Sequence, residues 1–132
     1  MATMSATATN VGPTLMCAQV RGHSYFADVP EEMGGHDVAA LPPEMLCAAL
    51  ANCIGMIVSL ACRDEDIPYE GLTVEVQAQP DEQRDQLDGF TVTITMPEDL
   101  SAEERAVVEQ AQALSKVRGT IINGASVQVT VA

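Results

Sequence analysis

A long apolar segment between Met45 and Cys62 constrains the fold of this chain more than any other feature. Within it, only Asn52 and Ser59 are conventionally polar. The tandem prolines Pro42-Pro43 come just before it and favour a helix start, because a residue in the first helical turn needs no amide donor. The sequence therefore predicts one long helix from about Pro43 to Arg63.

A membrane span is the first alternative for this segment. Its eighteen largely apolar residues reach the lower limit of length for a membrane-spanning helix. The segment is rich in Ala, Gly and Cys, however, and carries the polar Asn52 near its middle. The amphipathic strands elsewhere in the chain also need a helix to cover them. We therefore expect no membrane span.

A metal site is the second alternative, because the segment contains Cys47, Cys53 and Cys62. At about 100° per residue, Cys53 lies roughly 240° around the helix from Cys47, and Cys62 lies roughly 180° from Cys53. Thiols that point in three directions cannot gather round one ion, and both histidines lie in other segments. We expect no metal and no cofactor.

The predicted helix is apolar on every face, whereas a helix lying on one sheet normally has a polar outer face. A chain of 132 residues suits one domain, which is too small to cover such a helix on all sides. We expect a second subunit to supply the cover, as in a two-fold dimer whose central helices pack together. Small residues would permit close approach, namely Ala48, Ala49, Ala51 and Gly55.

Alternating apolar and polar residues predict strands on both sides of the helix. Residues 14–20 and 23–29 indicate a hairpin or two short strands. Residues 71–79 and 90–96 alternate more regularly and predict half-buried strands of an antiparallel sheet. A last alternating segment, residues 125–131, predicts a final strand.

A second helix is predicted to begin at a capping box, Ser101 to Glu104, and to run to about Val117. The order ββ–α–ββ–α–β then predicts an α+β fold, with two helices packed on one face of a mostly antiparallel sheet. We expect residues 1–12 to form a flexible N-terminus and residues 13–132 to form a single domain.

The charge of the chain narrows the classes of partner. The chain has six basic and nineteen acidic residues, which gives a net charge of −13. Such a surface repels phosphate, so we expect neither nucleic acid nor an anionic membrane as a partner. Residues 1–10 lack the basic start and the apolar run of a signal peptide. Together with four cysteines in no secreted-domain pattern, this favours a cytoplasmic location with reduced thiols.

Three segments resemble parts of the OsmC/Ohr family. The segment PPEMLCAALANCIGM (residues 42–56), followed by YEGLTVEV (residues 69–76), resembles the family's Leu/Ala-rich helix with its embedded cysteine. The segment GHSYFADVPEEMGG (residues 22–35) resembles the entry segment with its Asp-x-Pro and paired glycines. The segment SKVRGTI (residues 115–121) resembles the family's Cys-x-Val-x-x-Thr-Leu stretch. These segments span nearly the whole chain in the family's order.

The resemblance implies an OsmC-like fold with the long apolar helix at the centre of an intertwined homodimer, and active sites at the subunit interface. It also implies reduction of organic hydroperoxides by a reactive cysteine, which falls on Cys53. Attack on a peroxide requires a thiolate, and a nearby cation lowers the pKa of such a thiol. The family's arginine and glutamate fall nearest to Arg21 and Glu44. Cys47 and Cys62 match no catalytic position and are expected to be packing residues.

The chain departs from the family pattern at two positions. Ser115 stands where the resemblance places the resolving cysteine, and a serine hydroxyl cannot form a disulfide. The family's glutamate position is occupied by Pro43, and Glu44 lies one residue later.

Two functions therefore stay open. The first is a one-cysteine organic hydroperoxide reductase, a thiol-dependent peroxidase of oxidative-stress defence that uses an external thiol reductant. The second is a non-enzymatic dimer that binds an apolar small molecule or senses oxidation.

Overall fold

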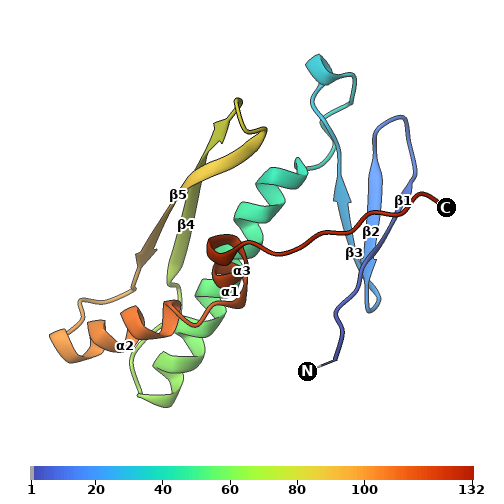
Figure 1. Cartoon of the computed structure of the whole chain (residues 1–132). Coiled ribbons are helices and arrows are strands. Elements are labelled where there is room, and N and C mark those ends of the chain that lie inside the picture. Colours follow the sequence, from blue (N-terminus) through green and yellow to red (C-terminus); the bar gives the residue numbers. More distant parts are fainter. Residues whose placement is uncertain (1) are drawn as a thin grey trace. The chain divides into compact units, whose positions relative to one another are not determined.

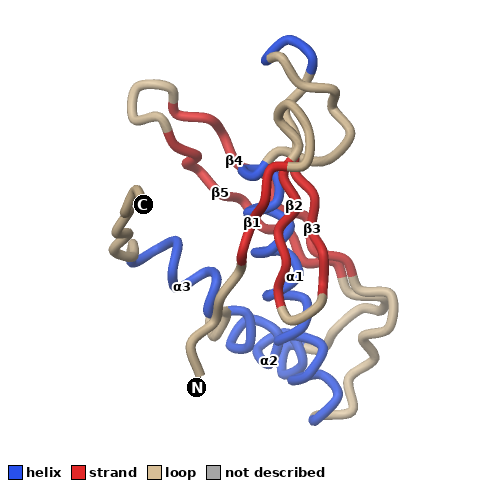
Figure 2. The backbone as a smooth tube through the Cα atoms, turned by 90° about the vertical axis from the view of Figure 1, so that its right-hand side faces the viewer, coloured by secondary structure: helices blue, strands red, loops and turns tan. Residues whose placement is uncertain are grey.

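The computed structural model describes residues 2–132 and combines helices with antiparallel strands, which confirms the predicted α+β class (Figure 1). The chain divides into two compact units, one ending at Leu46 and one beginning at Cys47. Each unit is therefore treated separately. The first three strands belong to the first unit, and the last two strands and last two helices belong to the second. Figure 2 draws the strands in red and the helices in blue.

The first unit contains a three-stranded antiparallel sheet in the order β1-β2-β3. β2 (Met16–Val20) and β3 (His23–Ala27) form the predicted hairpin, and Arg21-Gly22 turns between them with φ of 49° and 88°. β1 (Thr7–Asn10) pairs with β2 and was not predicted. All four residues of β1 are exposed, so this strand has no apolar alternation for a sequence pattern to detect. The flexibility expected for residues 1–12 stays a prediction.

The loop after β3 contains a short 3-10 helix, η1 (Glu31–Met33), and is organised by the buried carboxylate of Asp28. This carboxylate accepts hydrogen bonds from the Thr14 hydroxyl and from the amides of His36 (3.2 Å) and Val38 (3.3 Å). The Thr14 hydrogen bond is the largest cause that lowers the pKa of Asp28 to about 2, with the loop amides adding to it against desolvation. Asp28 therefore ties the loop to the sheet of its own unit.

The predicted long helix is α1 (Pro42–Asp64), and most of it belongs to the second unit. Its buried residues recur every fourth position, at Leu50, Ile54, Val58 and Cys62. This spacing produces a single buried stripe along one side of a helix. On the remaining sides Met56 is 66% exposed and Leu60 is 49% exposed. The second unit thus covers one side of α1 and leaves apolar residues in the open on the others.

β4 (Thr73–Asp81) and β5 (Gln86–Thr95) form the predicted antiparallel pair, with a β-bulge between Gln77 and Gln79. Their half-buried residues pack against the α1 stripe. A Cβ added to Gly55 would lie 3.4 Å from Val74 Cγ2. Gly55 therefore lets α1 approach β4 of the same unit, although we expected it to face a partner helix.

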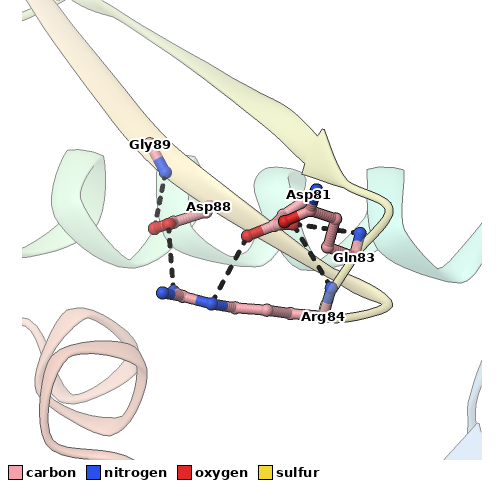
Figure 3. Close-up of polar contacts among 5 residues, drawn as sticks. All are labelled: Asp81, Gln83, Arg84, Asp88 and Gly89. Atoms are coloured by element: carbon pink, nitrogen blue, oxygen red, sulfur yellow. Dashed lines mark hydrogen bonds and ion pairs between the residues drawn. The ribbon is translucent and has the colours of Figure 1, made fainter.

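The tip of the β4–β5 hairpin is a polar cluster (Figure 3), and none of its residues belongs to the hydrophobic core. Asp81 Oδ1 accepts hydrogen bonds from the amides of Gln83 (3.2 Å) and Arg84 (3.3 Å). The Arg84 guanidinium pairs with Asp81 at 3.6 Å and with Asp88 at 3.9 Å. Exposed pairs of this kind contribute at most about 1 kcal/mol each, so this cluster shapes the turn without stabilising the core.

α2 (Ala102–Gln112) begins at the predicted capping box. Ser101 Oγ accepts from the Glu104 amide at 3.1 Å, and Glu104 Oε1 accepts from the Ser101 amide at 2.9 Å. The predicted end at Val117 is wrong, because the chain turns after Gln112 and starts a separate helix, α3 (Lys116–Asn123), with Ser115 as its N-cap. The core is built by α1, by α2 and by Ile67, which lies between α1 and β4. Its residues are Leu50, Ile54, Val58, Cys62, Ile67, Val108 and Ala111.

The final strand predicted at residues 125–131 is absent from the part of the chain that the structure describes. Residues 124–132 are exposed, with Val127 at 82%, Val129 at 85% and Val131 at 93%. The alternating pattern is that of a strand, but a strand forms only where a neighbour accepts its hydrogen bonds. Within residues 2–132, no segment pairs with it.

Candidate active site

Cys53 lies on α1 next to the buried stripe and is half-buried. The N-terminal end of α3 lies against it. The Ser115 side chain and the backbone of Lys116 and Val117 lie close enough to the Cys53 sulfur to lower its pKa. The first turn of a helix presents amides with no partner inside the helix, so α3 directs hydrogen-bond donors at the sulfur.

These contacts lower the pKa of Cys53 and so favour its thiolate form, whereas burial alone would raise that pKa. Burial is the largest single influence and raises the pKa of Cys53. The hydrogen bonds from the Ser115 side chain and from the Val117 and Lys116 backbone, together with the Lys116 charge, outweigh it and leave the pKa below its ordinary value. A depressed pKa at a helix N-terminus is typical of reactive cysteines.

Cys62 provides the contrast on the same helix. It is fully buried in the core, and burial, with a smaller contribution from the Glu104 charge, raises its pKa. A thiol in such surroundings behaves as a small apolar side chain. This agrees with the packing role predicted for Cys62. Cys47 is half-buried on the same helix.

Ser115 is 3% exposed and has two identifiable contacts. Its Oγ accepts a hydrogen bond from the Arg118 amide at 3.1 Å, which makes Ser115 the N-cap of α3. Its side chain also lies close enough to Cys53 to lower the pKa of that thiol. The structure therefore brings together Cys53 and the position that the resemblance assigned to a second cysteine. The catalytic roles of both residues stay predictions.

Arg21 and Glu44 belong to the first unit, and their roles at Cys53 also stay predictions. Arg21 lies exposed in the β2–β3 turn. Glu44 lies in the first turn of α1, where its Oε1 accepts a hydrogen bond from the Leu41 amide at 2.9 Å. In this position its negative charge also complements the positive end of the helix dipole. Glu44 therefore caps α1.

The sequence analysis missed the contribution of α3. Lys116 and the α3 amides act on Cys53, but the predicted second helix ran through this segment without a break. The available signal was Ser115 itself, because serine is a preferred N-cap residue and often marks a helix start. Across residues 2–132, no three His, Cys, Asp or Glu side chains gather in a way that would hold a metal ion.

A cavity of about 310 Å³ lies in the second unit near this site. It is bounded by α1, β5, α2 and α3, and its lining consists of Leu50, Ile54, Phe90, Val92, Gln112, Arg118, Ile121 and Ile122. Such a lining, mostly apolar with a few polar groups, is typical of small-molecule pockets. Leu50 and Ile54 of the buried α1 stripe form part of the wall, whereas Cys53 is not among the lining residues.

The fold and the position of Cys53 define a protein of the OsmC class. The OsmC-like protein family profile matches residues 34–130, which is well over half of the chain. The chain therefore belongs to the OsmC-like family, and the resemblance drawn from the sequence is confirmed. Among curated proteins, none matches the sequence at a significant level.

Solved structures with the same fold come from several bacteria. A Psychrobacter arcticus protein named for osmotic-stress induction and detoxification response has a TM-score of 0.81 and 20% identity, with 91% of this chain and 89% of that chain covered. An OsmC-like protein from Mycoplasma pneumoniae has a TM-score of 0.77 and 16% identity, with 93% and 89% covered. An organic hydroperoxide resistance protein OsmC from Legionella pneumophila has a TM-score of 0.60 and 20% identity, with 92% and 90% covered. At these identities the likeness establishes the fold.

Proposed function

We propose that the protein is a one-cysteine peroxidase that reduces organic hydroperoxides through Cys53. The observation that carries this proposal is the placement of half-buried Cys53, on α1, against the first turn of α3, which lowers the pKa of its thiol. Family membership supports it, because the similar proteins include one named for organic hydroperoxide resistance. The mostly apolar cavity bounded by α1 and α3, the two helices that meet at Cys53, suits substrates with a hydrocarbon body. The protein would act in oxidative-stress defence in the cytoplasm.

The reaction has two stages. The Cys53 thiolate attacks one peroxide oxygen, so that an S–O bond forms while the O–O bond breaks. The hydroperoxide leaves as an alcohol after taking up a proton, and Cys53 is oxidised by two electrons to a sulfenic acid. An external thiol then attacks the sulfenic sulfur to give a mixed disulfide and water. A second thiol releases Cys53 as the free thiol and is itself oxidised to a disulfide.

A homodimer is part of the proposal. The exposed apolar residues of α1, such as Met56 and Leu60, form a surface that monomers rarely leave open. The unpaired alternating segment at residues 125–131 likewise needs a neighbouring strand. In the dimer, we expect Arg21 and Glu44 to complete the site around Cys53. Analytical ultracentrifugation at micromolar concentration should give a dimer, and a stable monomer would contradict this part of the proposal.

A membrane location is the competing explanation for the same apolar surface. By length and composition alone, α1 could cross a membrane, since its most apolar window of 18 residues has a mean hydropathy of 2.1. Its buried stripe, however, packs against β4 and β5 of the second unit. We therefore propose that a partner subunit covers the exposed sides of α1.

The peroxidase function is tested by following the consumption of cumene hydroperoxide in the presence of a dithiol. Cys53→Ser should abolish the reaction, because a serine hydroxyl cannot attack the peroxide O–O bond and has no counterpart of the sulfenic acid. Cys47→Ser is the matched control: it lies on the same helix and is also half-buried. This control should retain the wild-type rate. Equal rates for wild type and Cys53→Ser would remove the proposed function.

Binding of an apolar small molecule is the second candidate, and the cavity of about 310 Å³ favours it. An environment-sensitive fluorescent probe, 1-anilinonaphthalene-8-sulfonate, should bind to wild type in a single saturable step. Ile121→Trp, which enlarges a residue of the cavity wall, should weaken that binding. If binding persists while Cys53→Ser changes no peroxide consumption, the non-enzymatic function stands in place of the peroxidase.

A further inference from the structure

The cavity of about 310 Å³ differs in charge from the cavity next to it. Among the described residues, its lining includes one charged side chain, Arg118, and no carboxylate. The neighbouring cavity, of about 550 Å³, also has an arginine in its wall, Arg105, but carboxylates accompany it there. The acidic residues of that wall are Glu98, Asp99 and Glu109. The smaller cavity is therefore lined by a cation without an acidic counterpart.

The Arg118 guanidinium makes no ion pair and no side-chain hydrogen bond within residues 2–132. The bond from Arg118 to Ser115 Oγ, at 3.1 Å, comes from the backbone amide and leaves the side chain unused. No fully buried side-chain nitrogen among the described residues lacks a partner, so the guanidinium nitrogens of this half-buried residue are accessible to a ligand. A guanidinium presents its N–H donors in a planar fork that matches a carboxylate.

The segment that carries Arg118 is positive in a strongly acidic chain. α3 contains Lys116 and Arg118 and no acidic residue. All nineteen acidic residues precede position 110, so the chain from residue 110 to residue 132 has no acidic side chain. A net charge of −13 repels anions in general, whereas a local excess of positive charge attracts them. An anionic ligand is therefore best placed at this part of the second unit.

The rest of the wall restricts the anion to one with a hydrocarbon body. Apart from Arg118 and Gln112, the lining is apolar, and it consists of Leu50, Ile54, Phe90, Val92, Ile121 and Ile122. A volume of about 310 Å³ holds about ten non-hydrogen atoms at about 30 Å³ each. One guanidinium balances one negative charge, which suits a carboxylate better than a phosphate monoester with a charge of about −1.5 to −2.

We propose that this cavity binds a medium-chain carboxylate, an aliphatic acid of about eight carbons. The carboxylate pairs with the Arg118 guanidinium, and the hydrocarbon chain packs against the apolar wall. The apolar contacts supply affinity for the chain, and the guanidinium selects an anionic head over an alcohol. This inference deepens the second candidate function by naming the class of ligand, and it does not depend on peroxide reduction at Cys53.

The test compares octanoate with octan-1-ol, an uncharged ligand of the same carbon number, by isothermal titration calorimetry on the full chain. Octanoate should bind to the wild type at least tenfold more tightly, because hydrogen bonds between charged groups are stronger than neutral ones. Arg118→Gln should weaken octanoate binding by about tenfold and octan-1-ol binding by less than twofold. The α3 cap survives this change, because Ser115 bonds to the backbone amide of residue 118.

Three further variants locate the site. Arg105→Gln removes the same charge from the neighbouring cavity, which shares Val92 and Gln112 with this one, and octanoate affinity should change by less than twofold. Ile121→Trp enlarges a residue of the wall and should weaken octanoate and octan-1-ol by a similar factor. Cys53→Ser should bind octanoate as the wild type does.

Equal affinities of the wild type for octanoate and octan-1-ol, or unchanged octanoate affinity in Arg118→Gln, would overturn the inference. If 1-anilinonaphthalene-8-sulfonate still binds in that case, the second candidate function stands without a carboxylate ligand. Octanoate binding that depends on Arg118, in a protein that consumes no cumene hydroperoxide, would remove the peroxidase function and support the inference.

Discussion

Replacing Ser115 by cysteine should create an intramolecular disulfide with Cys53 after oxidation. The Ser115 side chain lies close enough to Cys53 to lower its pKa, so we expect the introduced thiol to reach the sulfenic acid. The thiol attacks the sulfenic sulfur, the S–S bond forms, and the oxygen leaves as water. The chain between the two positions would become a closed loop within the second unit.

The size of the effect follows from the length of that loop. A cross-link that closes about 60 residues lowers the entropy of the unfolded chain enough to stabilise the native state by about 4 kcal/mol. Ser115 also caps α3, and loss of a serine cap costs about 1 kcal/mol. The oxidised variant should therefore be more stable than the reduced wild type by about 3 kcal/mol, whereas the reduced variant should be slightly less stable.

Mass spectrometry of proteolytic fragments under non-reducing conditions detects the disulfide, and chemical denaturation of oxidised and reduced samples measures its effect. The Ser101→Cys variant serves as the control, because it places a cysteine at the cap of a different helix, α2. It should form no cross-link to Cys53 at the protein concentration used. Absence of the disulfide in oxidised Ser115→Cys would refute the contact between Cys53 and the start of α3.

Three further predictions concern the fold around the site. Gly35→Ala should destabilise the protein by roughly 1–3 kcal/mol in thermal melts, because a Cβ there would clash with the Val29 carbonyl oxygen. Gly119→Ala is the control, since a Cβ there would meet nothing within 4 Å, and it should be neutral or stabilising. Val58→Ala should cost roughly 1.5–3 kcal/mol in denaturant titrations, since Val58 is fully buried, whereas Val38→Ala, at 63% exposure, should cost little. The pKa of Asp28 is about 2, below its ordinary value of 3.8, so its stabilising effect is complete above pH 3.8 and is lost as pH falls from 3.8 towards 2. Thermal melts across that window should show the loss in wild type and a flatter profile in Asp28→Asn.

The parts of the fold that the sequence predicted are those where apolar residues repeat at a regular period. Val74 and Val76 face Ile94 and Val92 across the β4–β5 pair, as strict alternation requires. The α1 stripe and the Ser101 capping box are equally local signals. β1 was missed because exposed strands carry no such period, and α3 was missed because its sequence, KVRGTIIN, mixes a glycine with β-branched residues that favour helix weakly.

The site was only partly predictable for a different reason. Cys53 was identified because the segment around it resembles a family motif. Composition alone does not distinguish any one of the four cysteines from the others. The approach of α3 to α1 depends on packing between segments about 60 residues apart in sequence, and local patterns carry no information on such packing. Asp28 was equally hidden, because its role depends on the Thr14 hydroxyl and on two loop amides.

The distribution of acidic residues among the helix N-termini supports an interaction between Cys53, on α1, and the N-terminal end of α3. A helix N-terminus favours negative charge, and in this strongly acidic chain both α1 and α2 have glutamates in the first turn: Glu44 in α1, and Glu103 and Glu104 in α2. α3 has no acidic residue in its first turn, and Lys116 stands there instead. A carboxylate at that place would compete with the Cys53 thiolate for the same amides and would raise the pKa of Cys53 through its charge. The helix without an acidic first turn is therefore the one whose N-terminal end lies against Cys53 and lowers the pKa of its thiol.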